Sequence, residues 1–203
     1  MAVKLTKNEQ KLQKDHLKQY QRYLPTLQLK KQQLQMVIRQ IEVQVASLRD
    51  QQKQVVDGMQ KWIAVYHENT VFPANLKLEN LIKIDRVVKA KGNIAGVTIP
   101  VFKELTFLPI EYDLNMYPLW VDKALESLRD CARYDALIST LEHQIRLLGK
   151  ELRTTSQRVN LFEKIKIPES KENIRKIGIY LGDQQTAAVV RGKIAKKKLV
   201  KGM

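Results

Sequence analysis

The side chains able to do chemistry are few and scattered along the 203-residue chain. His16, His67 and His143 lack a second ligand one helical turn away, so ordinary surface or seam histidines are expected rather than metal ligands. The single cysteine, Cys131, cannot form an internal disulfide and occupies an apolar repeat position, which favours a buried structural thiol over a nucleophile. The sequence therefore predicts no metal site and no bound cofactor.

The remaining candidates for catalysis are equally weak. Asp130 and Asp135 stand among basic residues of a helical segment, where surface ion pairs are the usual role of a carboxylate. Gly192-Lys193 lacks the preceding glycine-rich loop that a nucleotide-binding motif needs. The chain is thus expected not to be an enzyme.

The basic charge is concentrated at the two ends of the chain. Residues 1–31 hold eight basic and two acidic residues, and residues 164–203 hold eleven and three, whereas residues 32–163 hold seventeen and sixteen. Two solvated tails would explain either end alone, but the matched charge suggests one shared environment, namely an acidic surface, a phosphate polymer or a cavity of acceptor groups. The interface candidates are Lys4, Lys7, Lys11, Lys193, Lys196, Lys197, Lys198 and Lys201.

Two segments carry apolar residues at heptad spacing, the pattern of paired helices. The first covers residues 4 to about 66 and the second starts near residue 117. The predicted seam contains Leu27, Leu34, Ile41, Leu48, Val55, Ile138, Leu141, Ile145, Leu148, Leu152 and Val159. Met36 and Met59, on or near the first seam, are expected in the core. The two segments should pair with each other in antiparallel fashion, with both termini at one end.

The region between the helices predicts a β-hairpin. Residues 82–91 interleave β-branched and charged residues, Gly92-Asn93 is a two-residue turn signal, and residues 94–102 are typical of a returning strand. The predicted fold is mainly α, a long antiparallel two-helix coiled coil with a small β-hairpin head. Its parts are a long helix over 1–66, a connector head over 67–116, and a second long helix with a basic tail over 117–203.

Prolines and aromatic residues mark special positions on this plan. Pro25 and Pro168 lie at comparable distances from the chain ends and predict a bend or step in both helices. Trp62, Tyr117 and Trp120 are candidates for docking a partner, although local packing where the head rejoins the second helix is the simpler interpretation.

The sequence also suggests where the protein resides. Its start, Met1–Lys7, turns polar within a few residues and lacks the apolar core of a signal peptide, and the chain holds no apolar stretch long enough to span a membrane. A cytoplasmic protein is expected, without direct membrane insertion, so that any membrane link runs through a partner.

Three segments together resemble one family. They are residues 7–12 with 24–34, residues 93–100, and residues 158–168, of which the last is the most specific and includes Arg158, Val159 and Asn160. The chain resembles the D subunit of V-type ATPases, the central-stalk rotor subunit, over nearly its whole length. Its short C-terminal part is similar to the prokaryotic (V/A-type) form of that subunit.

The resemblance implies a role and a set of partners. It implies a rotor shaft without catalytic residues, whose terminal helices enter the hexamer of catalytic A and regulatory B subunits. The other end would meet the small F subunit and the adaptor subunit on the membrane ring. Rotation would couple ATP hydrolysis or synthesis to proton or sodium transport, and the complex would hold the chain at the membrane periphery.

Two other functions fit parts of the sequence. A prefoldin-like coiled-coil chaperone also joins two helices through a β-hairpin, but it predicts apolar helix tips where this chain has basic ones. A nucleic-acid-binding helical hairpin would place the lysines on phosphates. Because no base-stacking aromatic residues accompany those lysines, no nucleic acid partner is expected.

Overall fold

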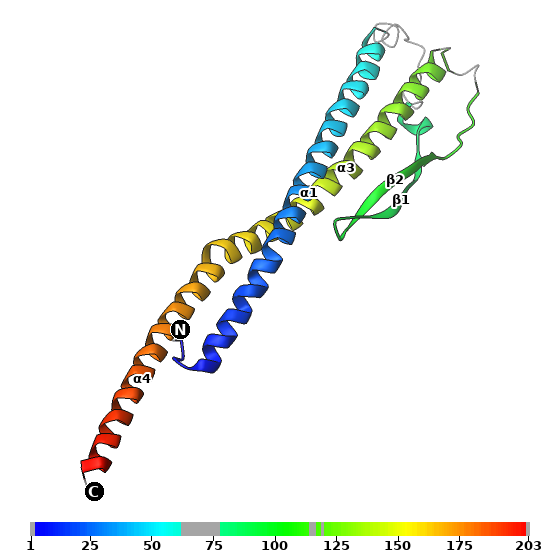
Figure 1. Ribbon diagram of the computed structural model, residues 1–203. Coiled ribbons are helices and arrows are strands. Elements are labelled where there is room, and N and C mark those ends of the chain that lie inside the picture. Colours follow the sequence, from blue (N-terminus) through cyan, green and yellow to red (C-terminus); the bar gives the residue numbers. More distant parts are fainter. Residues whose placement is uncertain (1–2, 62–77, 114–116, 119, 202–203) are drawn as a thin grey trace. The chain divides into compact units, whose positions relative to one another are not determined.

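The computed structural model describes residues 3–61, 78–113, 117, 118 and 120–201. Helix α1 spans Lys7–Gln60, the 3-10 helix η1 spans Leu78–Leu81, and the strands β1 and β2 span Ile84–Ile94 and Val97–Phe107. Helix α3 spans Val121–Leu161, a π-helical segment η2 spans Phe162–Lys166, and helix α4 spans Ile167–Lys201 (Figure 1). The predicted fold class, long N- and C-terminal helices around a small antiparallel β-hairpin, is confirmed.

The chain divides into two compact units. Residues 1–32 with 153–203 form one unit, and residues 33–152 form the other. Each unit therefore packs a segment of α1 against a segment from the second half of the chain.

Helix α1 begins at a side-chain cap. The Thr6 hydroxyl accepts a hydrogen bond of 3.2 Å from the backbone N–H of Glu9, three residues ahead. This Thr-x-x-Glu sequence satisfies one of the backbone donors that a first helical turn leaves open. The cap sets the start of the helix close to the position that the sequence suggested.

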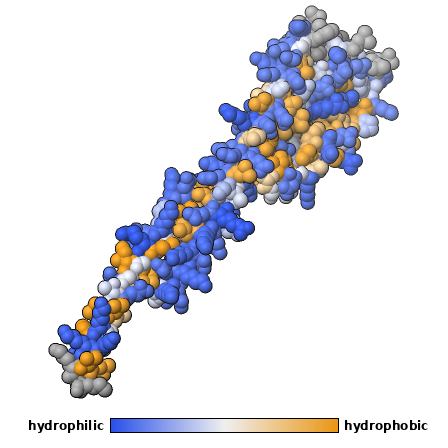
Figure 2. Space-filling model, in the orientation of Figure 1, coloured by the Kyte–Doolittle hydropathy of each residue, from blue (hydrophilic) through white to orange (hydrophobic). Residues whose placement is uncertain are grey.

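The unit of residues 33–152 has a core shared by α1, α3 and the hairpin. Its buried residues are Leu34, Ile41, Val45, Ile99, Ile138 and Leu148. The antiparallel pairing is visible in two polar contacts, since Arg49 reaches Glu142 at 2.5 Å whereas Gln52 reaches Asp135 at 2.7 Å. Figure 2 shows apolar residues gathered where the hairpin meets the helices, among largely hydrophilic helix surfaces.

The turn of the hairpin lies three residues beyond the predicted position. Ile94 pairs with Val97, so Ala95 and Gly96 form the two-residue turn. Both residues have positive φ values, 51° and 82°, as a type I′ turn requires. The prediction of a turn at Gly92-Asn93 was wrong, because Gly92 is needed inside β1 for close packing.

Gly92 within β1 lies where a larger residue would clash with the neighbouring strand. A Cβ at Gly92 would lie 2.8 Å from Cγ2 of Val101 on β2. Asn93 precedes the turn and stabilises it, since its side-chain oxygen accepts a 3.0 Å hydrogen bond from the Gly96 backbone N–H. Gly92 thus permits the close contact between strands, and Gly96 supplies the backbone freedom of the turn.

The unit of residues 1–32 with 153–203 pairs the first part of α1 with the end of α3, η2 and α4. The Tyr20 and Phe162 rings lie 5.1 Å apart, and a Cβ built at Gly178 would lie 3.4 Å from Nε2 of Gln10. These contacts run in opposite directions along the two halves, so this pairing is antiparallel as well. Thr155, Val159, Ser170 and Ile177 are its buried residues.

The two prolines behave differently. The second helix changes its hydrogen-bonding pattern just before Pro168, where the Ile167 N–H donates to the Phe162 carbonyl across a π turn. Helix α1, in contrast, continues through Pro25 without interruption. The second helix thus has an irregularity at its proline, whereas the single backbone bond lost at Pro25 did not end a helix of 54 residues. A bend of both helices at these prolines stays a prediction.

One core prediction also fails. Met36 is 59% exposed, on the side of α1 opposite to the buried Leu34, whereas Met59 is half-buried. Two residues turn a helix by about 200°, so Met36 cannot face the same partner as Leu34.

Among the described residues, no helix is both long and apolar enough to cross a membrane.

Candidate functional site

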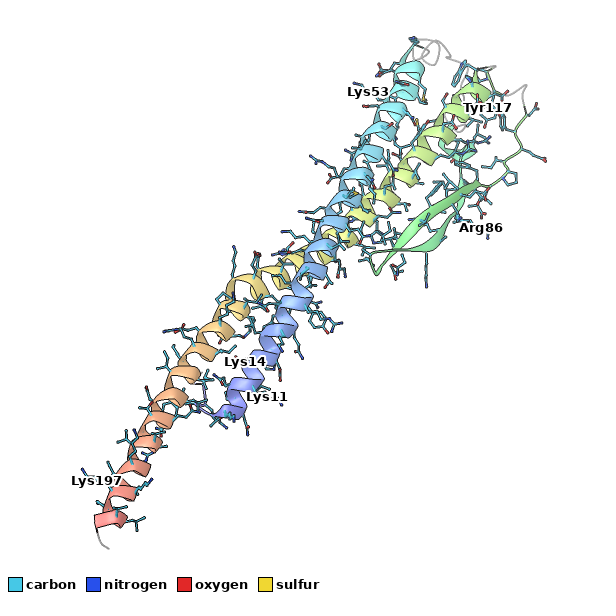
Figure 3. The ribbon with its side chains drawn as sticks, in the orientation of Figure 1. Lys11, Lys14, Lys53, Arg86, Tyr117 and Lys197 are labelled. Carbon is cyan, nitrogen blue, oxygen red and sulfur yellow. The ribbon has the colours of Figure 1, made fainter. Side chains whose placement is uncertain are left out.

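The last part of α4 carries all five C-terminal lysine candidates. Every residue from Val189 to Val200 is exposed. The group includes Lys193, Lys196, Lys197 and Lys198, and Lys201 is the last residue of the helix. We call residues 189–201 the terminal helix segment; Figure 3 labels Lys197 within it.

Of the N-terminal lysines, Lys7 lies beside an earlier stretch of α4. Lys7 and Gln10 line an open groove together with residues 178–188 of α4, including Gly178, Gly182 and Ala188. Lys4, Lys7 and Lys11 are exposed. The terminal helix segment therefore continues for about 20 Å beyond the groove, at 1.5 Å per residue. The two basic groups lie toward the same end of this unit but are staggered along α4.

Apolar side chains accompany the lysines on the terminal helix segment. Val189, Ile194, Leu199 and Val200 are 59%, 51%, 75% and 69% exposed. A helix exposed on all sides has no internal surface to bury such residues, and exposed apolar residues of this density are typical of a surface that another protein covers. Sequence reasoning selected the lysines and missed these residues, because their spacing follows no heptad.

The predicted seam residues lie along both units. Leu34, Ile41, Ile138, Leu148 and Val159 are buried, Leu48, Leu141, Ile145 and Leu152 pack against the core of the unit 33–152, and Leu27 and Val55 are half-buried. Thr155 is also buried, at a heptad position that a purely apolar seam would give to leucine. The seam positions the exposed surfaces described above and carries no chemistry itself.

The aromatic residues at the start of α3 pack locally. Tyr117 and Trp120 are half-buried and pack, with Tyr112, around a small cluster of Leu81, Val121 and Leu125. The Tyr112 hydroxyl donates a hydrogen bond to Asp122. That bond, with a smaller effect of burial and of the Asp122 charge, raises the pKa of Tyr112. Trp62, the third docking candidate, lies outside the described residues.

The motif residues that carried the family resemblance lie next to the π-helical segment. Val159 is 3% exposed, whereas Arg158 and Asn160 are exposed. The π segment starts two residues after Asn160, and its first residue, Phe162, contacts Tyr20. The motif thus coincides with the place where the second helix changes its hydrogen-bonding pattern.

The thiol and the carboxylates near it form no reactive centre. Cys131 is half-buried, and burial raises the pKa of its thiol, to which the charges of Asp135 and Asp130 add. A protonated thiol is a poor nucleophile. Within the described ranges, no group of three or more metal-ligating side chains is present.

These features together define a class of protein. Paired long helices, an inserted β-hairpin and an exposed basic helix end describe a mainly α, helical-hairpin protein. The sequence profile of the ATP synthase D subunit matches residues 9–197. The chain therefore belongs to the D-subunit family of ATP synthases, which confirms the resemblance inferred from its motifs.

Individual relatives agree with this assignment. The chain is 51% identical to the V-type ATP synthase D subunit of Borreliella burgdorferi over 199 residues, which cover 98% of this chain and 96% of the relative. It is 36% identical to the V-type ATP synthase D subunit of Chlamydia pneumoniae over 202 residues, covering 98% and 94% of the two chains. The protein of the same name from Chlamydia muridarum is 34% identical over 197 residues, covering 97% of this chain and 96% of that relative.

Proposed function

We propose that this chain is the central rotor shaft of a V-type ATPase or ATP synthase. The observation that supports it most directly is the terminal helix segment, which exposes apolar and basic residues from Val189 to Val200. Such a helix gains no stability from burial of its apolar residues within this chain, and a ring of ATPase subunits would cover them. Membership of the D-subunit family supports the same role.

The shaft acts through contacts rather than through bond chemistry. Its terminal helices enter the hexamer of A and B subunits, and its other end meets the small F subunit and the adaptor subunit of the membrane ring. Because the shaft is asymmetric, each rotational position favours a different nucleotide state of the surrounding sites. Rotation thereby couples ATP hydrolysis or synthesis to proton or sodium transport, and no residue of this chain is catalytic.

The three parts of the chain have separate tasks in this proposal. Residues 1–66 and 117–203 form the torque-bearing shaft, and residues 67–116 form a head that faces neighbouring subunits. The lysines near both chain ends line the part of the shaft within the hexamer. The chain remains cytoplasmic and reaches the membrane only through its complex.

Affinity purification from the native organism tests this function. A tagged full-length chain should recover two large ATPase-type subunits and one small subunit. A variant shortened after Ala188, which loses the terminal helix segment, should retain the small subunit and lose most of the large ones. Recovery of neither class of subunit with the full-length chain would overturn the proposal.

A further inference from the structure

The β-hairpin has two different faces. Along β1, exposed residues alternate with half-buried ones from Val88 to Ile94. Lys89 and Lys91 lie on the exposed face, directly across the ladder from Phe102 and Pro100 of β2. Pro100 and Phe102 are half-buried, and Phe102 also lines a groove with Arg133 and Tyr134 of α3. The hairpin thus presents two exposed lysines beside two half-buried rings.

The opposite face is fastened to the helices. Ile99 is 3% exposed and belongs to the core that α1 and α3 form, and Ile94, Ala95 and Val97 at the turn pack against that core. The buried Gln144 of α3 donates a 2.5 Å hydrogen bond to the Pro100 carbonyl. A two-stranded ribbon is marginally stable alone, so these contacts hold the outer face in a fixed position.

The lysines on this face have no acidic partner within the part of the chain that the structure describes. Several helical charges in contrast form ion pairs, such as Lys123 with Glu126, Arg133 with Asp130, and Arg175 with Glu172. The backbone positions of Lys89 and Lys91, two residues apart on one strand, are about 7 Å apart. The face therefore carries two neighbouring positive charges, which a pair of carboxylates from another molecule would complement.

We propose that the outer face of the hairpin, formed by Lys89, Lys91, Pro100 and Phe102, is a docking surface for an acidic segment of a neighbouring protein subunit. The lysines pair with its carboxylates, and the two rings with the lysine stems provide the apolar contact. This inference rests on the proposed function, because that function supplies the assembly in which a neighbouring subunit meets the hairpin.

Lysine acetylation in the assembled complex tests the surface. The purified complex, the isolated chain and a urea-unfolded sample are treated with acetic anhydride, and the modification of Lys89 and Lys91 is measured by mass spectrometry. Both lysines should react more slowly in the complex than in the isolated chain. A carbodiimide, which joins amines to carboxylates in direct contact, should link them to Asp or Glu of another subunit.

Matched variants separate charge from folding. K89E/K91E should weaken retention of the linked subunit by about tenfold, the combined effect of two exposed ion pairs. K89R/K91R keeps both charges and should retain that subunit, and circular dichroism should show the same helix content in both variants.

Two outcomes would overturn the docking surface. One is equal acetylation of both lysines in the complex and in the isolated chain. The other is slower acetylation of both lysines on phosphatidylglycerol vesicles but not in the assembled complex. If the tagged chain recovers no ATPase subunits at all, the proposed rotor function fails instead, so the two failures are distinguishable.

Discussion

The side-chain N–H of Gln144 on α3 donates a 2.5 Å hydrogen bond to the backbone carbonyl of Pro100 on β2. Gln144 is only 6% exposed, so this bond joins a buried donor to the hairpin. Replacing Gln144 by Leu keeps most of the volume and leaves the carbonyl without its donor. The free energy of unfolding should fall by about 1–3 kcal/mol, measured by urea denaturation.

An exposed glutamine provides the control for this variant. Gln44 lies on the exposed side of α1, and Q44L should change the free energy of unfolding by less than about 0.5 kcal/mol. Equal stability of the wild type and Q144L would mean that the bond to Pro100 does not hold the hairpin.

Gly92 permits close contact between the strands, so a methyl group there should destabilise the hairpin. In G92A the new Cβ would stand 2.8 Å from Cγ2 of Val101, which must then move. The expected loss is about 1–3 kcal/mol, seen as a lower melting temperature. V101A in the same chain should recover part of that loss.

Gly58 is the matched glycine on α1. A Cβ at Gly58 meets nothing within 4 Å, so G58A should stabilise the helix by up to about 1 kcal/mol. If G92A and G58A shifted the melting temperature in the same direction, steric crowding at Gly92 would not explain the effect of G92A.

Sequence reasoning located the long helices and the hairpin because their signals are local and repeated. A heptad over many turns identifies a helix and its buried stripe, as at Leu34 and Ile41. The turn was misplaced because a glycine signals both a turn and a close contact. Gly92 serves the second purpose, and Gly96 the first.

Other features depend on contacts that no local pattern contains. The π segment before Pro168 involves a shift of backbone hydrogen bonds opposite Tyr20 of α1. Pro25 is an equal sequence signal for a helix irregularity, yet α1 continues through it. The exposure of Met36 follows from which stripe of α1 the second helix covers. The lysines at the chain ends were visible from charge counts, whereas the stagger between them required the structure.

Leu148 should be among the residues that contribute most to stability. It is 0% exposed within the core of α1, α3 and the hairpin. L148A removes buried methyl groups and leaves a cavity, which should cost about 2–5 kcal/mol in urea denaturation. L29A, at a residue that is 66% exposed, should cost less than about 0.5 kcal/mol. Similar losses in both variants would contradict the assigned core.

The Cys131 thiol should react slowly in the folded protein. Burial, with the charges of Asp135 and Asp130, raises the pKa of Cys131, so the thiolate fraction near pH 8 is smaller than in the unfolded chain. The raised pKa contributes stability that is present below the unfolded value and is lost as pH rises through the folded one. Ellman's reagent should react faster in urea than in buffer.

Asp135→Asn isolates the electrostatic part of this effect. It removes one of the two charges while leaving an oxygen that can accept the bond from Gln52. The native reaction rate should rise, although by less than on unfolding, because burial is the larger cause. Equal rates in buffer and urea would show that the folded environment does not suppress the thiolate.

Under the proposed function, the charged and the apolar residues of the terminal helix segment should contribute differently to binding of the large ATPase-type subunits. Replacing Lys193, Lys196, Lys197 and Lys198 by Gln should weaken recovery of the large subunits by about tenfold or more at low salt, and by less at high salt, because salt screens exposed charges. The corresponding Lys→Arg variant should behave like the wild type. Replacing Val189 and Ile194 by Ser should weaken recovery at every salt concentration, because burial of apolar surface is not screened. Recovery of the Gln variant that equals the wild type at all salt concentrations would remove the lysines from the interface and leave the apolar residues as its basis.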